Sequence, residues 1–270
     1  MKIVILSDNE GNDILQGEWG MSAIISYNGK NILLDTGASG LFAENAEKLK
    51  FDLASVDFGV LSHAHYDHSD GMEKFFEINK DASFYIREST AENCYKKVLL
   101  LKKYIGIKKG TLDKYSNRIV SVSGDFELCP GVYLIPHKTE NLSDIGKMEK
   151  MYQKSNNRWI YDNFSHEQSL VFKTGKGLVI FNSCSHGGAA NIINEVSNTF
   201  PDDPVYAMIG GFHLFNKPEN YVRDFASAIR ATGIKYICTG HCTGDGAYDI
   251  LAEELGDICH KMSVGLTFEL

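Results

Sequence analysis

Short apolar runs alternate with amphipathic stretches along most of the chain. Runs of about four to seven residues rich in Val, Ile and Leu, bounded by polar or Gly-containing turns, are typical of β-strands. Such runs predict strands at residues 2–6, 22–27, 31–35, 59–62, 83–86, 119–123, 132–135, 169–173, 178–182, 205–209, 236–239 and 263–268. Apolar residues at helical spacing predict helices near residues 41–49, 71–78, 189–196, 221–231 and 247–255.

Turn residues and the order of these segments narrow the fold class. Asn28-Gly29 joins the second and third predicted strands and is the strongest short signal for a β-hairpin. Strands interspersed with helices indicate sheets that are covered by helices. The pattern therefore predicts an α/β protein with mixed sheets. A chain of 270 residues is long enough for one large domain or two small ones.

Two stretches interrupt the alternation and are predicted to be insertions. Residues 88–118 form a Lys-rich region that is predicted to be helical. Its lysines could attract a phosphate-bearing substrate. The alternative is a solvated amphipathic helix whose residues 99–101 and Ile105 pack onto the protein. Residues 139–165 are predicted to be a lid-like loop. Its aromatic residues could stack on a planar ring or pack in the core; they are Tyr152, Trp159 and Tyr161.

Composition excludes several classes of protein. The net charge of -8 argues against extensive nucleic-acid binding, which favours a basic surface. No apolar run approaches the roughly 18 residues of a membrane span, and the N-terminus lacks the pattern of a secretory signal. We therefore expect a cytoplasmic protein with no membrane partner. The six cysteines form no CxxC pair and are expected to be free thiols.

The segment Ser62-His63-Ala64-His65-Tyr66-Asp67-His68 is the main chemical signal. It directly follows a predicted strand. On an extended backbone residues two apart point to the same side, so His63 and His65 can hold one cation together. A turn can then direct Asp67 and His68 to a second cation. Imidazole and carboxylate ligands predict one or two divalent ions, with zinc favoured and iron or manganese as alternatives.

Further candidate ligands follow later predicted strands. His186 and His241 each come just after a strand, inside Gly-containing loops, and are predicted to bind metal. His213 has a similar position, but substrate contact is the favoured role. Cys184 lies two residues before His186, and ligation or simple packing are both open, since thiolate is a good zinc ligand. His166 precedes the strand at 169–173 and is a further candidate.

On these motifs the sequence resembles the metallo-β-lactamase superfamily. His63-x-His65-x-Asp67-His68 matches its HxHxDH signature, and residues 31–37, which read NILLDTG, match its upstream strand end. The resemblance implies a single domain over residues 1–270 with an αββα sandwich of two mixed β-sheets and helices outside. It also implies that Asp35 orients the motif loop rather than binding metal.

Within that superfamily the chain is most similar to a dihydropterin synthase-like branch, whose archaeal members join a dihydropterin to a ribofuranosyl-aminobenzene phosphate. The segments that carry this similarity are residues 20–22, 61–68, 184–192, 210–214 and 239–244. Two residues depart from the family pattern. Cys184 stands where a bridging Asp is usual, and Trp19 stands where relatives often have His. Whether His166 or His186 completes the first metal site is left open.

The motif and the resemblance together predict a metal-dependent hydrolase that acts on a small, anionic, phosphate-bearing molecule by means of metal-activated water. Asp67 is the predicted catalytic residue, and His213, His166 and Asn191 are predicted to contact the substrate. Asn191 lies in the first turn of a helix opened by His186-Gly-Gly, and helix N-termini attract anions. The alternatives are a dihydropterin synthase-like transferase, a phosphodiesterase or nuclease, and a non-hydrolytic metal protein.

Overall fold

The computed structural model describes residues 1–270, and the chain divides into two compact units. Unit 1 consists of Met1–Ser123, Glu140–Gln168 and Val264–Leu270, and unit 2 consists of Gly124–Thr139 and Ser169–Ser263. Each unit contains its own seven-stranded sheet. The helices of the structure are all too short or too polar to cross a membrane.

The large sheet of unit 1 has the strand order β18-β1-β2-β3-β4-β5-β8. The strands at the β18 end pair antiparallel, whereas β3, β4, β5 and β8 run parallel. Their bounds are β1 Lys2–Ser7, β2 Ser22–Tyr27, β3 Lys30–Leu34, β4 Phe58–Val60, β5 Ser83–Arg87, β8 Ile119–Val122 and β18 Thr267–Glu269. The predicted hairpin at Asn28-Gly29 is confirmed, because Tyr27 pairs with Lys30 across it.

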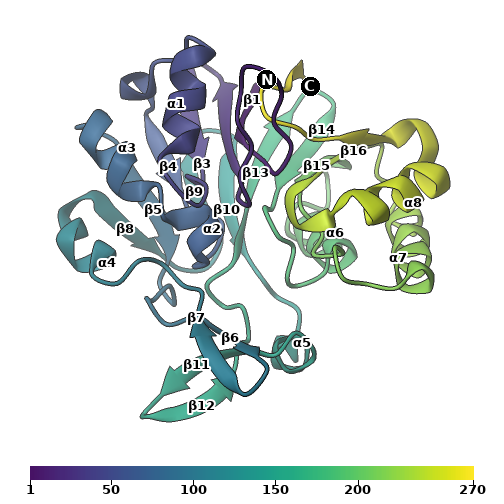
Figure 1. The fold of residues 1–270 in the computed structure, drawn as a ribbon. Helices are drawn as coiled ribbons and strands as arrows, with labels where there is room; N and C mark the ends of the chain where they lie inside the picture. Colours follow the sequence, from purple (N-terminus) through teal and green to yellow (C-terminus); the bar gives the residue numbers. More distant parts are fainter. The chain divides into compact units, whose positions relative to one another are not determined.

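Helices α1 and α3 lie beside this sheet (Figure 1). Their apolar faces supply Phe42 and Phe75, which are fully buried in one cluster with Leu33 and Phe84 of the strands. Burying such side chains contributes about 1.5–3 kcal/mol each. The helical segments of unit 1 are α1 Leu41–Lys48, η1 Leu53–Ser55, α2 Tyr66–Ser69, α3 Met72–Ile78, α4 Thr111–Lys114, η2 Ser116–Arg118 and α5 Leu142–Met148.

Unit 1 also contains a four-stranded sheet of order β12-β11-β6-β7, which we call the small sheet (Figure 1). Its strands are β6 Tyr95–Val98, β7 Leu101–Tyr104, β11 Met151–Ser155 and β12 Arg158–Tyr161. The helix predicted within residues 88–118 is therefore wrong, apart from the single turn of α4. The physical reason is pairing between the two insertions, since Tyr95 of β6 lies opposite Tyr152 of β11. Periodicity within one segment cannot reveal such a partner.

The sheet of unit 2 has the order β17-β16-β15-β14-β13-β10-β9, and β14, β15, β16 and β17 run parallel. Its strands are β9 Phe126–Cys129, β10 Val132–Pro136, β13 Gln168–Thr174, β14 Gly177–Phe181, β15 Val205–Gly210, β16 Tyr236–Thr239 and β17 Cys259–Lys261. Its helical segments are α6 Ala189–Thr199, α7 Glu219–Ala231, η3 His241–Thr243, α8 Asp245–Leu255 and η4 Gly256–Ile258. The three α-helices bury Ile192, Val222 and Leu251 in one core with the strands.

The end of the chain differs from its prediction. A single strand was expected at 263–268, but the structure has two short strands, β17 and β18, separated by a turn. The first pairs with β16 in unit 2, and the second pairs with β1 in unit 1. Long-range pairing therefore determines where both strands lie.

Glu195 of α6 holds the segment that follows β10. Its carboxylate accepts hydrogen bonds from His137 Nδ1 at 3.2 Å, the Lys138 N–H at 3.0 Å and the Thr139 N–H at 2.8 Å. Burial alone would raise the pKa of Glu195, but the hydrogen bond and charge of His137 and the bonds from residues 138 and 139 hold it below its ordinary value. The charged carboxylate is thus favoured in the folded protein.

We expect Glu195→Gln to lower the free energy of unfolding at pH 7 by about 2 kcal/mol, because hydrogen bonds to a charged group are lost. A lowered pKa in the folded state contributes stability above the unfolded pKa of about 4.3, and this contribution disappears as the pH falls through the folded value. The difference between wild type and variant should therefore shrink between about pH 5 and pH 3. Urea unfolding at several pH values measures it, with the exposed Glu47→Gln as control. A difference that does not change with pH would contradict this role.

Candidate metal centre

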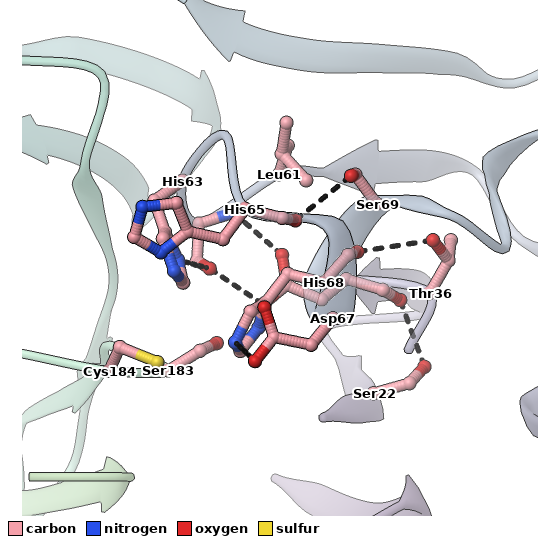
Figure 2. Close-up of polar contacts among 12 residues, drawn as sticks. Ser22, Thr36, Leu61, His63, His65, Asp67, His68, Ser69, Ser183 and Cys184 are labelled. Atoms are coloured by element: carbon pink, nitrogen blue, oxygen red, sulfur yellow. Dashed lines mark hydrogen bonds and ion pairs between the residues drawn. The ribbon is translucent and has the colours of Figure 1, made fainter. Parts of the chain in front are cut away.

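The three histidines of the sequence motif converge in unit 1 (Figure 2). The loop that carries them follows β4 and continues into α2. The ring centroids of His63 and His65 are 4.6 Å apart, and those of His63 and His68 are 4.2 Å apart. The Asp67 carboxylate lies 3.9 Å from His68 Nε2. All four side chains are buried, so the predicted cluster forms in one loop.

Asp35 holds this loop from the end of β3. Its side chain is fully buried and accepts three hydrogen bonds: from the Ser62 N–H at 2.7 Å, from Ser62 Oγ at 2.6 Å and from His68 Nδ1 at 2.9 Å. Its backbone has a φ of +56°, a conformation that costs a non-Gly residue free energy and that clusters at functional sites. The orienting role predicted for Asp35 agrees with this geometry.

The hydrogen bonds around Asp35 assign the protonation of two rings. A carboxylate only accepts, so His68 must donate through Nδ1–H. The single hydroxyl hydrogen of Ser62 goes to Asp35, so Ser62 Oγ accepts from His63 Nδ1, which is 2.8 Å away. In both rings the lone pair is therefore on Nε2. A metal-binding histidine has this arrangement, with a second group fixing its other nitrogen.

Backbone contacts fix the path of the loop. Thr36 donates to the His68 carbonyl through both its N–H and its hydroxyl, at 2.8 and 3.1 Å. Ser69 Oγ donates to the His65 carbonyl at 2.9 Å, and the Met21 N–H donates to the Asp67 carbonyl at 3.2 Å. Figure 2 shows the bonds that the Thr36 and Ser69 hydroxyl groups donate. The loop is thus held by Thr36 after β3, by Met21 before β2 and by Ser69 of α2.

Gly71, which follows α2, lies very close to the backbone of the segment after β3. A Cβ at this position would lie 2.2 Å from the Thr36 carbonyl oxygen and 2.5 Å from that of Ser39. Both are backbone atoms, so no side chain can move away. We expect Gly71→Ala to lower the free energy of unfolding by about 1–3 kcal/mol. Thermal unfolding measures it, with Gly246→Ala as control, since nothing lies within 4 Å of a Cβ there. Equal stability of the two variants would contradict this prediction, because it would show that the backbone around Gly71 moves to accommodate the added methyl group.

His166 is also placed in unit 1, where its ring is 1% exposed. Its Nδ1 accepts a hydrogen bond from the Ala64 N–H at 3.2 Å, between the two histidines of the HxH pair. Its Nε2 lies 3.2 Å from Asp162 Oδ2 and 3.6 Å from Cys94 Sγ. Since Nδ1 accepts, the neutral ring carries its hydrogen on Nε2 and donates it to Asp162.

Donor atoms of His65, Cys94, Asp162 and His166 lie within 4.8 Å of one another. This group has the composition of a cation site, but the bond from the Ala64 N–H puts the hydrogen of His166 on Nε2. A protonated ring nitrogen cannot bind a metal. We therefore interpret the group as a hydrogen-bonded support of the loop. Neither Cys94 nor Asp162 was found from the sequence, because no local pattern marks them.

The later candidates gather in unit 2, at the carboxyl ends of β14, β15 and β16. Donor atoms of Cys184, His186 and His213 lie within 4.8 Å of one another, as do those of Cys184, His241 and Cys242. The structure thus brings together the residues that were predicted at these strand ends. His213, for which substrate contact was favoured, lies in the same donor group as Cys184 and His186. Asn191 is exposed, and its amide donates to the Gly187 carbonyl at 2.8 Å.

Three of these loops have strained backbone. Ser185, His213 and His241 have φ values of +54°, +51° and +46°, a region that side chains other than Gly, Asn and Asp rarely adopt. Each such residue costs about 1–3 kcal/mol and persists only where its surroundings enforce it. The three lie at the ends of neighbouring parallel strands. His213 and His241 each belong to a group of potential metal donors that includes Cys184.

Cys242 is a potential ligand that the sequence analysis missed. Its Sγ accepts a hydrogen bond from the His213 N–H at 3.3 Å. Burial would raise the pKa of this thiol, but a hydrogen bond with Cys184 and the nearby His241 and His213 hold it well below its ordinary value. Gly211 makes room for it, because a Cβ there would lie 2.5 Å from Sγ. The adjacent His-Cys pair in a Gly-rich loop was the available signal.

The donor set fits a divalent transition metal. Imidazole nitrogen, carboxylate oxygen and thiolate sulfur are the ligands of zinc and similar ions. In unit 1 the tautomers of His63 and His68 place a lone pair on Nε2, as coordination requires. His63, His65, Asp67 and His68 of unit 1, and Cys184, His186, His213, His241 and Cys242 of unit 2, are the residues that could hold such ions.

Comparison with known proteins gives consistent results. The family model described as the metallo-beta-lactamase superfamily matches residues 20–145. A 7,8-dihydropterin-6-methyl-4-(beta-D-ribofuranosyl)-aminobenzene-5'-phosphate synthase from Methanocaldococcus jannaschii is 29% identical, over 98% of this chain and 95% of that protein. The predicted resemblance to this family and to this branch is confirmed.

Solved structures agree on the fold. A metal-dependent hydrolase of the beta-lactamase superfamily has a TM-score of 0.86 and 26% identity, over 100% of this chain and 99% of that chain. A diphosphatase from the PhnP family has a TM-score of 0.55 and 16% identity, over 100% and 97% of the two chains, which shows the fold alone. The predicted fold class, an α/β protein of metallo-β-lactamase type with mixed sheets, is confirmed.

Proposed function

We propose that this chain, which is similar to the metallo-β-lactamase superfamily over residues 20–145, is a metal-dependent hydrolase of a small, phosphate-bearing molecule. One observation carries the proposal. Three buried imidazoles and a carboxylate share one loop, and Asp35 and Ser62 orient two of the rings so that each Nε2 has its lone pair available for coordination. We propose one or two ions, with zinc favoured and iron or manganese as alternatives.

The bound ion would supply Lewis acidity and would lower the pKa of a bound water towards about 7. The protein supplies the remaining parts. Asp67 offers a carboxylate oxygen beside the histidines, where it can accept a hydrogen bond from the attacking water. Asp35 keeps the hydrogen of His68 on Nδ1 and, through Ser62, that of His63. The burial of the loop limits competing solvent around these groups.

The substrate class rests on similarity and on charge. The archaeal relative is named for a product that carries a 5'-phosphate, and one structural relative is named as a hydrolase. The lysines of β6 and β7 give an acidic chain a local basic region in unit 1. A helix N-terminus follows His186 at α6, and such ends favour anions.

A second candidate function is transfer rather than hydrolysis. The archaeal synthase and the hydrolase both match nearly the full length of this chain, at 29% and 26% identity. In a synthase the same residues would orient a phosphate-bearing substrate and its leaving group. Product analysis separates the two, since a hydrolase incorporates the oxygen of water and a transferase joins two substrates.

The test combines metal content with activity. Purified protein is stripped with a chelator, reloaded with zinc, iron or manganese, and assayed against phosphomonoesters, phosphodiesters and a dihydropterin paired with an aminobenzene riboside phosphate. We expect His65→Ala and Asp67→Ala to lose at least about 100-fold in activity. The exposed His260→Ala and Asp13→Ala serve as matched controls. Folded His65→Ala or Asp67→Ala protein with wild-type activity would overturn the proposal.

A further inference from the structure

The turn between β6 and β7 presents apolar side chains to solvent. Val98, Leu99, Leu100 and Leu101 are 51%, 90%, 93% and 77% exposed. We call these four residues the tip. The sequence analysis considered that residues 99–101 pack onto the protein from a helix, and the structure shows that they do not. Four consecutive exposed aliphatic residues are rare on a soluble surface and mark interaction sites.

The backbone of the tip is also unfavourable. Val98 pairs with Leu101, so Leu99 and Leu100 form a two-residue hairpin loop. Such loops favour Asn-Gly, which this chain uses at Asn28-Gly29. Leu99 instead has a φ of +55°, which is unfavourable for a side chain of its kind. Neither solvation nor conformation explains leucine here, so contact with another surface is the remaining physical reason.

The strands behind the tip are basic on both sides. Lys96 lies opposite Lys103, and Lys97 lies opposite Lys102. Like charges in directly opposed positions destabilise a hairpin. They occur in a chain whose net charge is -8. An external surface of negative charge would turn this repulsion into attraction.

We propose that the tip docks onto an anionic lipid bilayer, with its leucines in the interfacial region and the exposed Lys97 and Lys103 at the head groups. Aliphatic side chains next to lysines are the composition of peripheral membrane anchors, and lysine stems reach from apolar depth to charged head groups. No spanning helix is needed for this mode. This proposal assigns lysines of β6 and β7 to lipid head groups, and its test does not depend on the metal site or on the proposed hydrolysis.

Two other partners fit the charges less well. A nucleic acid would engage the lysines but would leave the leucines in water. A second copy of this chain, packed tip to tip about a two-fold axis, would bring both sets of lysines together. A bilayer with anionic lipid satisfies the leucines and the lysines at once.

The tip is connected directly to the motif loop. Beyond β7 the Tyr66 N–H donates to the Ile105 carbonyl at 2.9 Å, and the Ile107 N–H donates to the Ala64 carbonyl at 3.1 Å. The segment that follows β7 thus pairs with the backbone on either side of His65. Docking would fix the motif loop relative to the bilayer.

Vesicle sedimentation tests the proposal. The whole protein is mixed with vesicles of phosphatidylcholine alone, or with phosphatidylserine as one third of the lipid. We expect binding to the second kind only, weakened by salt because screening reduces the attraction of exposed charges. Leu99→Ser/Leu100→Ser should weaken binding at least about tenfold, and Lys97→Gln/Lys103→Gln should weaken it by several-fold.

Matched controls separate the tip from general surface effects. Ile14→Ser replaces another exposed aliphatic residue, and Lys176→Gln/Lys235→Gln removes two exposed lysines elsewhere, so both should bind as wild type does. Leu99→Trp gives a second readout, a blue shift of tryptophan emission on anionic vesicles. No binding by wild-type protein, or equal binding by the serine variant, overturns the proposal. A dimer that the serine variant dissociates would assign the tip to a second copy instead.

Discussion

Asp35→Asn lowers the affinity of the protein for zinc by about 10- to 100-fold, the range typical of groups that orient metal ligands. The amide nitrogen at this position faces either the Ser62 N–H or, in the other orientation, both Ser62 Oγ and His68 Nδ1, and the wild-type carboxylate accepts from all three. The first orientation places two donors against each other, and the second places an N–H against His68 Nδ1. His68 would then have to move its hydrogen to Nε2, which removes the lone pair that coordinates. Titration of the stripped protein against a competing chelator measures the change.

Asp57→Asn is the matched control for this substitution. It changes the same functional group near the opposite end of β3, where Asp57 accepts hydrogen bonds from Lys30 Nζ and the Asn31 N–H. Its zinc affinity should equal that of wild type. If Asp35→Asn fails to fold, Ser62→Ala removes only the hydroxyl between Asp35 and His63 and should give a smaller loss. Unchanged affinity in folded Asp35→Asn would refute the orienting role.

His166→Ala lowers the free energy of unfolding by about 3–5 kcal/mol. The substitution leaves a cavity, takes a partner from the buried Asp162 carboxylate, and leaves the Ala64 N–H without its acceptor. Asp162 keeps its hydrogen bonds from the Phe164 N–H at 2.8 Å and from Gln153 at 2.9 Å, but it loses the partner that most lowers its pKa. Urea unfolding of the variant and of wild type measures the loss.

Metal content distinguishes support of the loop from ligation. His166→Asn should recover part of the stability, because the asparagine oxygen can accept from the Ala64 N–H. At saturating zinc both His166 variants should bind as many ions per chain as wild type. A smaller number of ions in folded His166→Asn would show that His166 is a ligand, against the tautomer inferred here.

The elements with strong local signals were predicted well. The hairpin at Asn28-Gly29 needs only two residues with positive φ, so its sequence was sufficient. Parallel strands β14, β15 and β16 are continuous apolar runs, which a buried strand requires on both faces. The HxHxDH loop was also recognisable, because its ligands lie within one short segment.

The small sheet could not be predicted, because its strands come from two insertions. Met151 of β11 lies opposite Lys96 of β6, about 55 positions earlier in the chain. The paired lysines flanked by apolar residues in β6 and β7 are also compatible with a solvated helix face. The tertiary pairing selected strands and left the tip exposed.

The sequence by itself determined most of the strand and helix succession, the grouping of His63, His65, Asp67 and His68 as candidate metal ligands, and the position of later histidines at strand ends. Only the tertiary structure decided the tautomers that Asp35 and Ser62 assign, the use of His166 as a support, and the place of Cys242. The physical reason is the distance along the sequence over which each interaction acts. A periodic pattern or a motif acts within a few residues, whereas hydrogen-bond partners such as Ala64 and His166 are brought together by the whole fold.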